Sequence, residues 1–174
     1  RRAGIEAAFR RTDGPRDPIA HRCHTYGLLQ WVPLSATSQD RAPDNYEFRS
    51  SMCSSLCLNW WVAGDVPAEE IPEDFPYAWA RTTLESYLKY REFYYGDYYP
   101  LTPYSQNRDV WMAYQLDRPD LGKGMLVVLR RPDSPYETAR FKLRGLGKGA
   151  SYVVTDLDTG KQTYGAAFHP QFQT

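Results

Sequence analysis

The stretch Tyr94-Tyr95-Gly96-Asp97-Tyr98-Tyr99-Pro100-Leu101-Thr102-Pro103-Tyr104 divides the chain into two parts with different patterns. Before it, residues 77–95 hold no glycine or proline, and apolar residues recur at spacings of three and four. This spacing predicts a helix that ends at Gly96. After the stretch, short apolar runs alternate with turn residues, which indicates antiparallel strands. We therefore place a boundary between residues 95 and 96.

The second part is expected to be an antiparallel sheet that belongs to a β-sandwich. Turn residues separate its apolar runs at regular intervals, as is typical of short strands joined by hairpins. We find no internal repeat in it. The expected strands are Val110–Gln115, Met125–Arg130, Ala139–Leu143, Ser151–Asp156 and Gln162–Tyr164.

The first part is more irregular. Residues 25–32, Thr-Tyr-Gly-Leu-Leu-Gln-Trp-Val, are apolar and β-rich and stop at Pro33, which predicts a buried strand. Residues 35–46 are polar and turn-like, and residues 46–49 are expected to form a second short strand. An acidic, proline-bearing connector at residues 67–76 leads into the long helix.

Composition excludes several classes of function. The 174 residues carry 21 basic and 21 acidic side chains, so we expect no nucleic-acid partner bound through bulk positive charge. No apolar run is long enough to span a membrane, so no membrane partner is expected. The chain begins with Arg1 rather than Met, which suggests a processed product, an excised domain or a fragment.

Three cysteines allow two interpretations. Cys23, Cys53 and Cys57, together with His24, form in principle a Cys3His zinc site, but their spacing lacks a second close pair. We favour buried thiols, which point slightly to a reducing, cytoplasmic location, and we expect no cofactor.

Aromatic residues make up 15% of the chain, which suits either a sugar-binding surface or a packed junction. Their concentration within residues 75–104 favours packing. At this junction we expect the Asp97 carboxylate to fix the turn by accepting backbone hydrogen bonds.

Several motifs carry a resemblance to a known family. They are residues 94–104, Trp111–Gln115 followed by Arg118-Pro119, the segment His24-Thr25-Tyr26-Gly27-Leu28, Trp31–Leu34 and Tyr46–Ser50. Together they resemble the C-terminal part of α-galactosidase-like glycoside hydrolases of family 36, over roughly residues 9–160. The resemblance implies that residues 1–95 are the end of a (β/α)8 catalytic barrel and residues 96–174 a truncated antiparallel β-sandwich.

The length of the chain limits this architecture. A closed barrel needs about 200 residues and a sandwich about 100 more, so 174 residues cannot hold both. We expect a missing N-terminal barrel segment, or a partner chain that supplies it. The expected substrate is a carbohydrate, an α-galactoside. The alternative is a non-catalytic carbohydrate-binding or interaction module.

The resemblance also implies site residues. Retaining glycosidases use two carboxyl groups, a nucleophile and an acid/base. Residues 10–13, Arg-Arg-Thr-Asp, are similar to the family's acid/base segment, which assigns that role to Asp13; the alternative is an Asp-Gly turn. No segment matches the nucleophile, so this chain alone is expected to be inactive.

Four further residues are expected to line the sugar site, because they flank the predicted late strands. For each of them a structural role is the alternative: core packing, a hydrogen-bonded histidine or an ion pair. The candidates for substrate binding are His24, Trp31, Tyr46 and Arg49.

Overall fold

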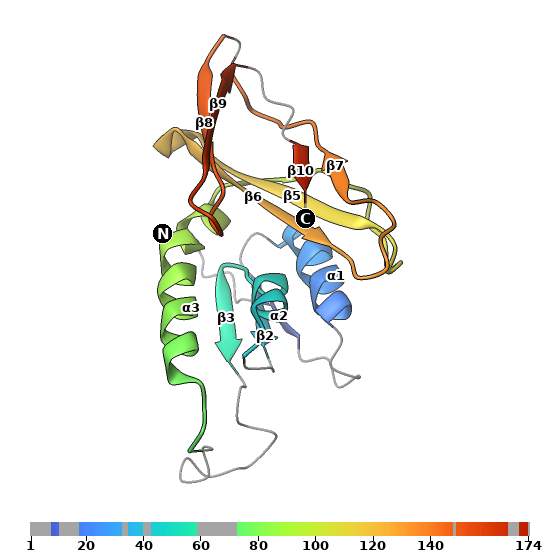
Figure 1. Cartoon of the computed structure of the whole chain (residues 1–174), viewed down its shortest axis with the longest axis vertical. Coiled ribbons are helices and arrows are strands. Elements are labelled where there is room, and N and C mark those ends of the chain that lie inside the picture. The colour runs from blue at the N-terminus through green and yellow to red at the C-terminus, as the bar shows by residue number, and fades with distance from the viewer. Residues whose placement is uncertain are drawn as a thin grey trace.

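The computed structural model describes residues 8–10, 18–32, 35–39, 43–58, 73–147, 149–166 and 171–173. These residues form a small mixed α/β fold. Figure 1 shows the antiparallel strands in the upper half of the molecule and the helices with the parallel strands in the lower half.

A parallel sheet comes first in the chain. Its strands are β1 (Ala8–Arg10), β2 (Ser35–Gln39) and β3 (Ser55–Leu58), and they lie side by side in the order β1-β2-β3. Helix α1 (Pro18–Leu29) connects β1 to β2, and α2 (Asn45–Ser50) connects β2 to β3. Parallel neighbours need such crossover connections. The described strands do not close into a barrel.

Helix α1 replaces the strand expected at residues 25–32, so that prediction is wrong. The buried apolar side chains of this segment are Ile19, Cys23, Tyr26 and Leu29, at spacings of four and three that place them on one face of a helix. The helix begins at Pro18, whose fixed φ suits a first turn. The pattern is therefore visible only when it is followed back to residue 18.

Helix α2 replaces the strand expected at residues 46–49, which is a second error. The Asp44 side chain caps this helix and accepts a hydrogen bond from the backbone N–H of Glu47 over 2.9 Å. The polar segment before it was expected to be a turn, and residues 35–39 instead form β2 between two parallel partners.

The long helix is confirmed. Helix α3 spans Tyr77–Tyr90 and continues as a 3-10 helix, η2 (Arg91–Tyr95), up to Gly96. Gly96 also allows a close approach, since a Cβ at this position would lie 2.0 Å from the carbonyl oxygen of Asp117. A substitution at Gly96 therefore moves the backbone of the neighbouring strand.

The antiparallel strands expected after residue 96 are also confirmed. Strands β4 (Asp97–Pro100), β5 (Trp111–Arg118) and β6 (Lys123–Arg130) form one sheet in that order, with a 3-10 turn, η3 (Pro119–Leu121), between β5 and β6. Two further sheets have two strands each in the described part of the chain. They pair β8 (Ser151–Thr155) with β9 (Gln162–Ala166), and β7 (Thr138–Arg140) with β10 (Gln171–Gln173).

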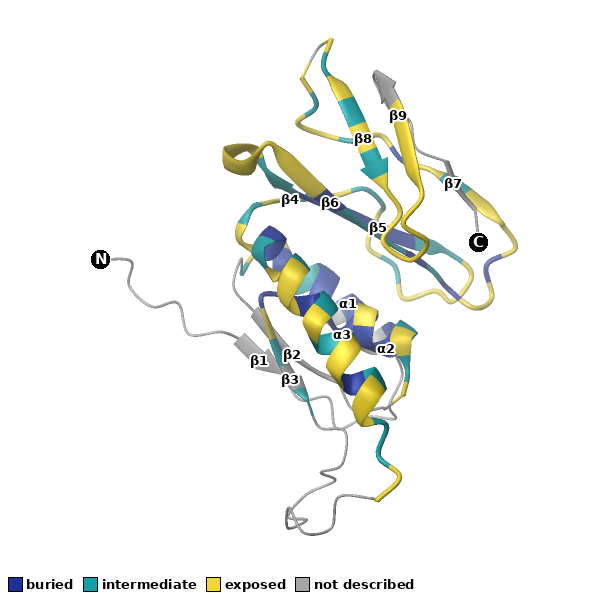
Figure 2. Ribbon diagram, turned by 60° about the vertical axis from the view of Figure 1, so that its left-hand side comes forward, coloured by how far each residue is buried: buried dark blue, intermediate teal, exposed yellow. Residues whose placement is uncertain are grey.

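One hydrophobic core spans both parts of the chain. Tyr26 of α1 is only 1% exposed, and its ring contacts Tyr98, Tyr104 and Tyr114 at centroid distances of 6.1, 6.5 and 6.3 Å. Its hydroxyl donates a hydrogen bond to the carbonyl oxygen of Thr102. Figure 2 shows α1 as a largely buried helix beside the sheet of β4, β5 and β6. We call this tyrosine cluster the joint.

A buried arginine supports the joint from beside Cys23, on the same face of α1 as Tyr26. The Arg131 side chain follows β6 and is 0% exposed. Its guanidinium donates to the carbonyl oxygens of Ser105, over 2.6 Å, and of Asn107, and it lies 3.4 Å from the Cys23 sulfur. Arg131 therefore ties the loop after β4 to helix α1.

We expect Arg131→Met to lower the free energy of unfolding by about 2–3 kcal/mol. The substitution leaves buried carbonyl oxygens without the charged donor that satisfies them in the wild-type chain. Arg81→Met, at an exposed position on α3, is the matched control and should change stability by less than about 0.5 kcal/mol. Urea unfolding of both variants measures this. Equal stability of the two would contradict the structural role of Arg131.

The structure reverses the expectation for Asp97. Its carboxylate makes no hydrogen bond with the described residues, and it lies directly opposite Asp117 in the β4–β5 register. Burial, and then the facing charge of Asp97, raise the pKa of Asp117 above its usual value of 3.8. Two like charges in such a pair destabilise a sheet.

We therefore expect Asp97→Asn to stabilise the chain at pH 7, by up to about 1 kcal/mol. The folded state holds the Asp117 proton more tightly than the unfolded state, so stability falls as the pH rises from 3.8 through the raised pKa. The gain should shrink as the pH falls through the raised pKa of Asp117, because a protonated Asp117 carries no charge to repel its neighbour. Urea melts from pH 3 to 7 test this, with Asp109→Asn, at an exposed loop position, as the control. A destabilised Asp97→Asn variant would restore the turn-fixing role.

Candidate functional site

The carboxyl ends of the parallel strands are the first place to look for a site, because ligands of parallel α/β folds bind at that edge. The strands end at Arg10, Gln39 and Leu58. The segments that follow, residues 11–17, 40–42 and 59–72, lie outside the described residues. Asp13, the expected acid/base, belongs to the first of them.

Trp31 lies at the opposite edge of the parallel sheet. It follows the end of α1 and precedes β2, so it stands at the amino ends of the strands. Its side chain is 84% exposed, although an apolar strand in the core was expected here. His24 lies within α1, and its side chain is outside the description.

Tyr46 takes part in an internal network. From the first turn of α2, its hydroxyl donates to the carbonyl oxygen of Arg130 in β6 over 2.8 Å and accepts a hydrogen bond from Arg22. The Arg22 guanidinium also lies 4.6 Å from the centre of the Tyr46 ring. Burial raises the pKa of Tyr46, while the positive charge of Arg22 opposes this rise. The hydroxyl thus has two protein partners already.

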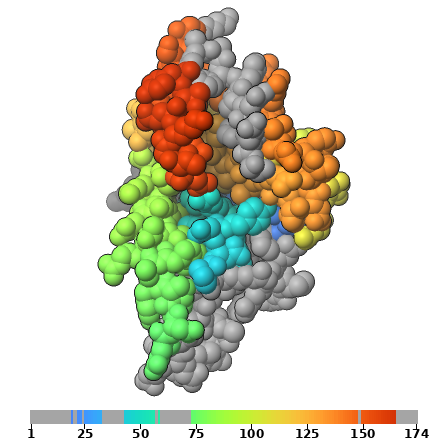
Figure 3. Space-filling model, in the orientation of Figure 1, coloured from blue at the N-terminus to red at the C-terminus, as the bar shows by residue number. Residues whose placement is uncertain are grey.

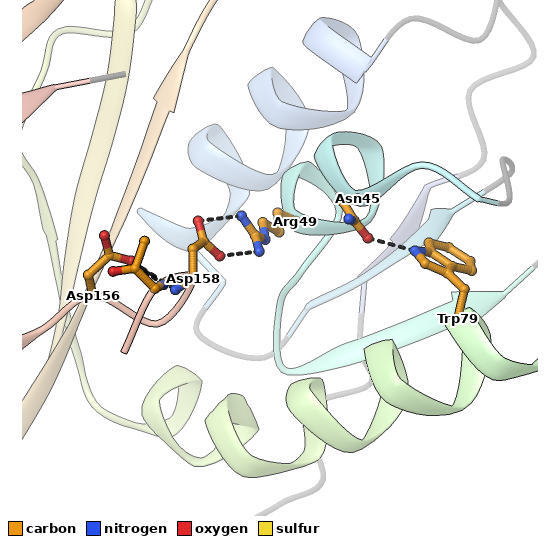
Figure 4. A network of polar contacts seen from close by, with 6 residues as sticks. Asn45, Arg49, Trp79, Asp156 and Asp158 are labelled. Atoms are coloured by element: carbon orange, nitrogen blue, oxygen red, sulfur yellow. Dashed lines mark hydrogen bonds and ion pairs between the residues drawn. The ribbon is translucent and has the colours of Figure 1, made fainter. Parts of the chain in front are cut away.

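Arg49 binds the C-terminal hairpin. Its guanidinium forms a two-point ion pair with Asp158, with one N–O distance of 2.8 Å, as Figure 4 shows. The Asp156 carboxylate accepts the backbone N–H groups of Asp158 and Thr159 over 2.8 and 3.2 Å. These bonds lower the pKa of Asp156 and fix the turn that presents Asp158. In Figure 3 the red hairpin reaches down to the cyan surface around α2.

The other end of α2 is tied to α3. The indole N–H of Trp79 donates to the side-chain oxygen of Asn45 over 2.6 Å, again visible in Figure 4. Helix α2 is therefore held by α3 at its first residue and by the β8–β9 hairpin at its last turn. Tyr46 and Arg49 both take part in this arrangement through the contacts described above.

A hollow of about 500 Å³ lies where the C-terminus of α1 meets η2, β4 and β5. Trp31 and Gln30 come from the helix end, and Tyr94, Tyr98 and Leu116 from the opposite side. No local sequence pattern predicts this hollow, because the end of α1 lies more than sixty residues before the other residues that line it. The exposure of Trp31 is the feature that draws attention to it.

The described residues do not support a metal centre. They hold no group of three or more His, Cys, Asp or Glu side chains that could ligate an ion. Cys23 and Cys53 are buried thiols, and the Cys53 sulfur lies 2.7 Å from the carbonyl oxygen of Ser55. The side chains of Cys57 and His24 lie outside the description. None of the described helices is long and apolar enough to cross a membrane.

Comparison of the chain with protein-family models, with curated proteins and with solved structures found no match. The function therefore has to be argued from the residues and their arrangement.

The Arg49–Asp158 pair gives a direct test of the hairpin contact. We expect Arg49→Ala, Asp158→Ala and the double variant to define a coupling energy of about 0.2–1 kcal/mol, since both side chains are about half exposed. The coupling should shrink in 1 M salt, where exposed charges are screened. Chemical unfolding in low and high salt measures it. Additive effects in low salt would contradict a docked hairpin.

Proposed function

We propose that this chain is part of a retaining glycoside hydrolase that acts on α-galactosides, and that it supplies the acid/base carboxyl group, Asp13, but not the nucleophile. The observation that carries the proposal is the order of the elements. Three parallel strands follow one another in sequence, joined by α1 and α2, and then α3 leads into antiparallel strands.

This order suits the end of a (β/α)8 barrel. In such a barrel, consecutive strands are parallel neighbours, as β1, β2 and β3 are here. The change to antiparallel pairing begins at Asp97, one residue after the boundary drawn from sequence. On this proposal residues 1–95 are the end of the catalytic barrel and residues 96–174 are an incomplete β-sandwich.

The position of Asp13 in the sequence fits its proposed role. It comes three residues after the last residue of β1, on the carboxyl side of the strand, where barrel enzymes carry their catalytic groups. There it would protonate the leaving oxygen and later take a proton from the attacking water. On this proposal a second carboxylate, about 5–5.5 Å away, comes from a missing N-terminal barrel segment or from a partner chain.

The proposal assigns Tyr46 and Arg49 a structural role. Each would have to give up the hydrogen bonds described above before it contacted a sugar. His24 stays a candidate for the catalytic pocket on the strength of the resemblance alone. Trp31 stands at the wrong edge of the sheet for that pocket.

The test is made in the natural polypeptide that carries these residues together with the sequence encoded before them. Asp13→Asn should lower kcat for an alkyl α-galactoside by about 10²- to 10⁴-fold, the usual contribution of general acid–base catalysis. The loss should be smaller for a nitrophenyl α-galactoside in the glycosylation step, because this leaving group needs little protonation. Added azide should restore turnover and yield a galactosyl azide of retained configuration.

Asp17→Asn is the matched control, since it removes a carboxylate four residues away in sequence and should keep activity. The 174-residue chain alone should not hydrolyse a nitrophenyl α-galactoside, because double displacement needs both carboxyl groups. Full activity of Asp13→Asn, or turnover by the isolated chain, would overturn the proposal. Sugar binding without hydrolysis by the longer polypeptide would favour a non-catalytic binding module instead.

A further inference from the structure

We propose that the hollow beside Trp31 is a second sugar-binding site, separate from the catalytic end of the parallel sheet, that takes a neutral α-galactosyl oligosaccharide. The choice of sugar rests on the proposed function. The site itself rests on the exposure of Trp31, the lining of the hollow and its position in the fold.

Trp31 offers an open aromatic face. At 84% it is the most exposed of the large hydrophobic side chains in the described part of the chain, and its indole makes no hydrogen bond with the described residues. A single exposed apolar side chain is ordinary on a protein surface, but Trp31 also lines the hollow, so its indole adds an aromatic wall to a concave surface. A pyranose ring presents a flat face of C–H groups that stacks on an indole, and the indole N–H donates to a hydroxyl.

The hollow has an apolar floor and is large enough for a small ligand. Tyr94, Tyr98 and Leu116 line it from η2, β4 and β5. Tyr94 and Leu116 are buried and packed in the hydrophobic core, so this floor is fixed before any ligand arrives. Its volume of about 500 Å³ lies in the range of small-molecule sites.

Polar groups stand beside this apolar floor. Gln30 and Asp97 line the hollow and are exposed. The Gln30 amide nitrogen is 3.4 Å from the carbonyl oxygen of Tyr26, which leaves the amide oxygen as an acceptor. Sugar hydroxyls both donate and accept, so an amide with a nearby carboxylate suits them. None of the residues lining the hollow is basic, which disfavours a phosphorylated or acidic sugar.

The position of the hollow separates it from the proposed chemistry. Trp31 precedes β2 and lies at the amino ends of the strands, whereas Asp13 follows the carboxyl end of β1 in the sequence. A ligand in the hollow therefore does not occupy the catalytic pocket. Its role would be to hold a distant part of a long oligosaccharide substrate, or a second oligosaccharide molecule, against the enzyme.

The experiment titrates the 174-residue chain with raffinose, an α-galactosyl trisaccharide, by calorimetry. We expect binding that Trp31→Ala weakens tenfold or more and that Trp31→Phe largely keeps, because phenylalanine retains a flat ring. Tyr164→Ala is the control: this side chain is 71% exposed on β9 and does not line the hollow, so raffinose binding should be unchanged. Melting curves check that all variants are folded.

Three outcomes would overturn the inference. They are no raffinose binding by the folded wild-type chain, equal binding by Trp31→Ala, and binding of choline in place of raffinose, which would make the hollow an aromatic site for cations. Equal binding by Trp31→Ala would show that the sugar binds elsewhere on the chain. The result is independent of the Asp13 test, since loss of hydrolysis in Asp13→Asn concerns the longer polypeptide and raffinose binding concerns this chain.

Discussion

The burial of Tyr26 against three other tyrosine rings is the contact on which the rest of the structure depends. Helix α1 has one side toward the parallel strands that it connects and another toward the antiparallel sheet, and Tyr26 fixes the second contact. Arg131 adds hydrogen bonds to the same region. The boundary near residue 96 is therefore a change in strand topology, while the core continues across it. Burial also raises the pKa of Tyr94 and Tyr114, as expected for hydroxyls that pack inside a protein.

The long helix and the second part of the chain were largely predictable because their patterns are local. Helix α3 has a clear three-and-four spacing, Gly96 ends its 3-10 continuation, and each hairpin strand lies between turn residues. The errors fall on α1 and α2, where β-rich residues such as Thr25 and Tyr26 outweighed the helix-start signals. Those signals were present: Pro18 at a first turn, and Asp44 three residues before Glu47, a spacing typical of helix caps.

The candidate site was harder to predict because it depends on contacts between distant residues. The Arg49–Asp158 pair joins positions 109 residues apart, and no local pattern encodes which carboxylate an exposed arginine will meet. The exposure of Trp31 was equally hard to predict from local sequence. Its apolar neighbours in the sequence suggested burial, but the fold leaves its side chain exposed to solvent. Asp13 was proposed from its motif alone, and in the sequence it follows the last residue of β1 by three positions.

The joint has a consequence for how such a chain can change over evolutionary time. A contact made only of aliphatic side chains tolerates many substitutions, provided that the total volume and the hydrophobic pattern are kept. The joint instead combines ring contacts of defined geometry with a buried guanidinium that requires carbonyl oxygens at set positions. A foreign C-terminal half would have to supply both at once. The two halves are therefore expected to be inherited together, as a single unit of recombination.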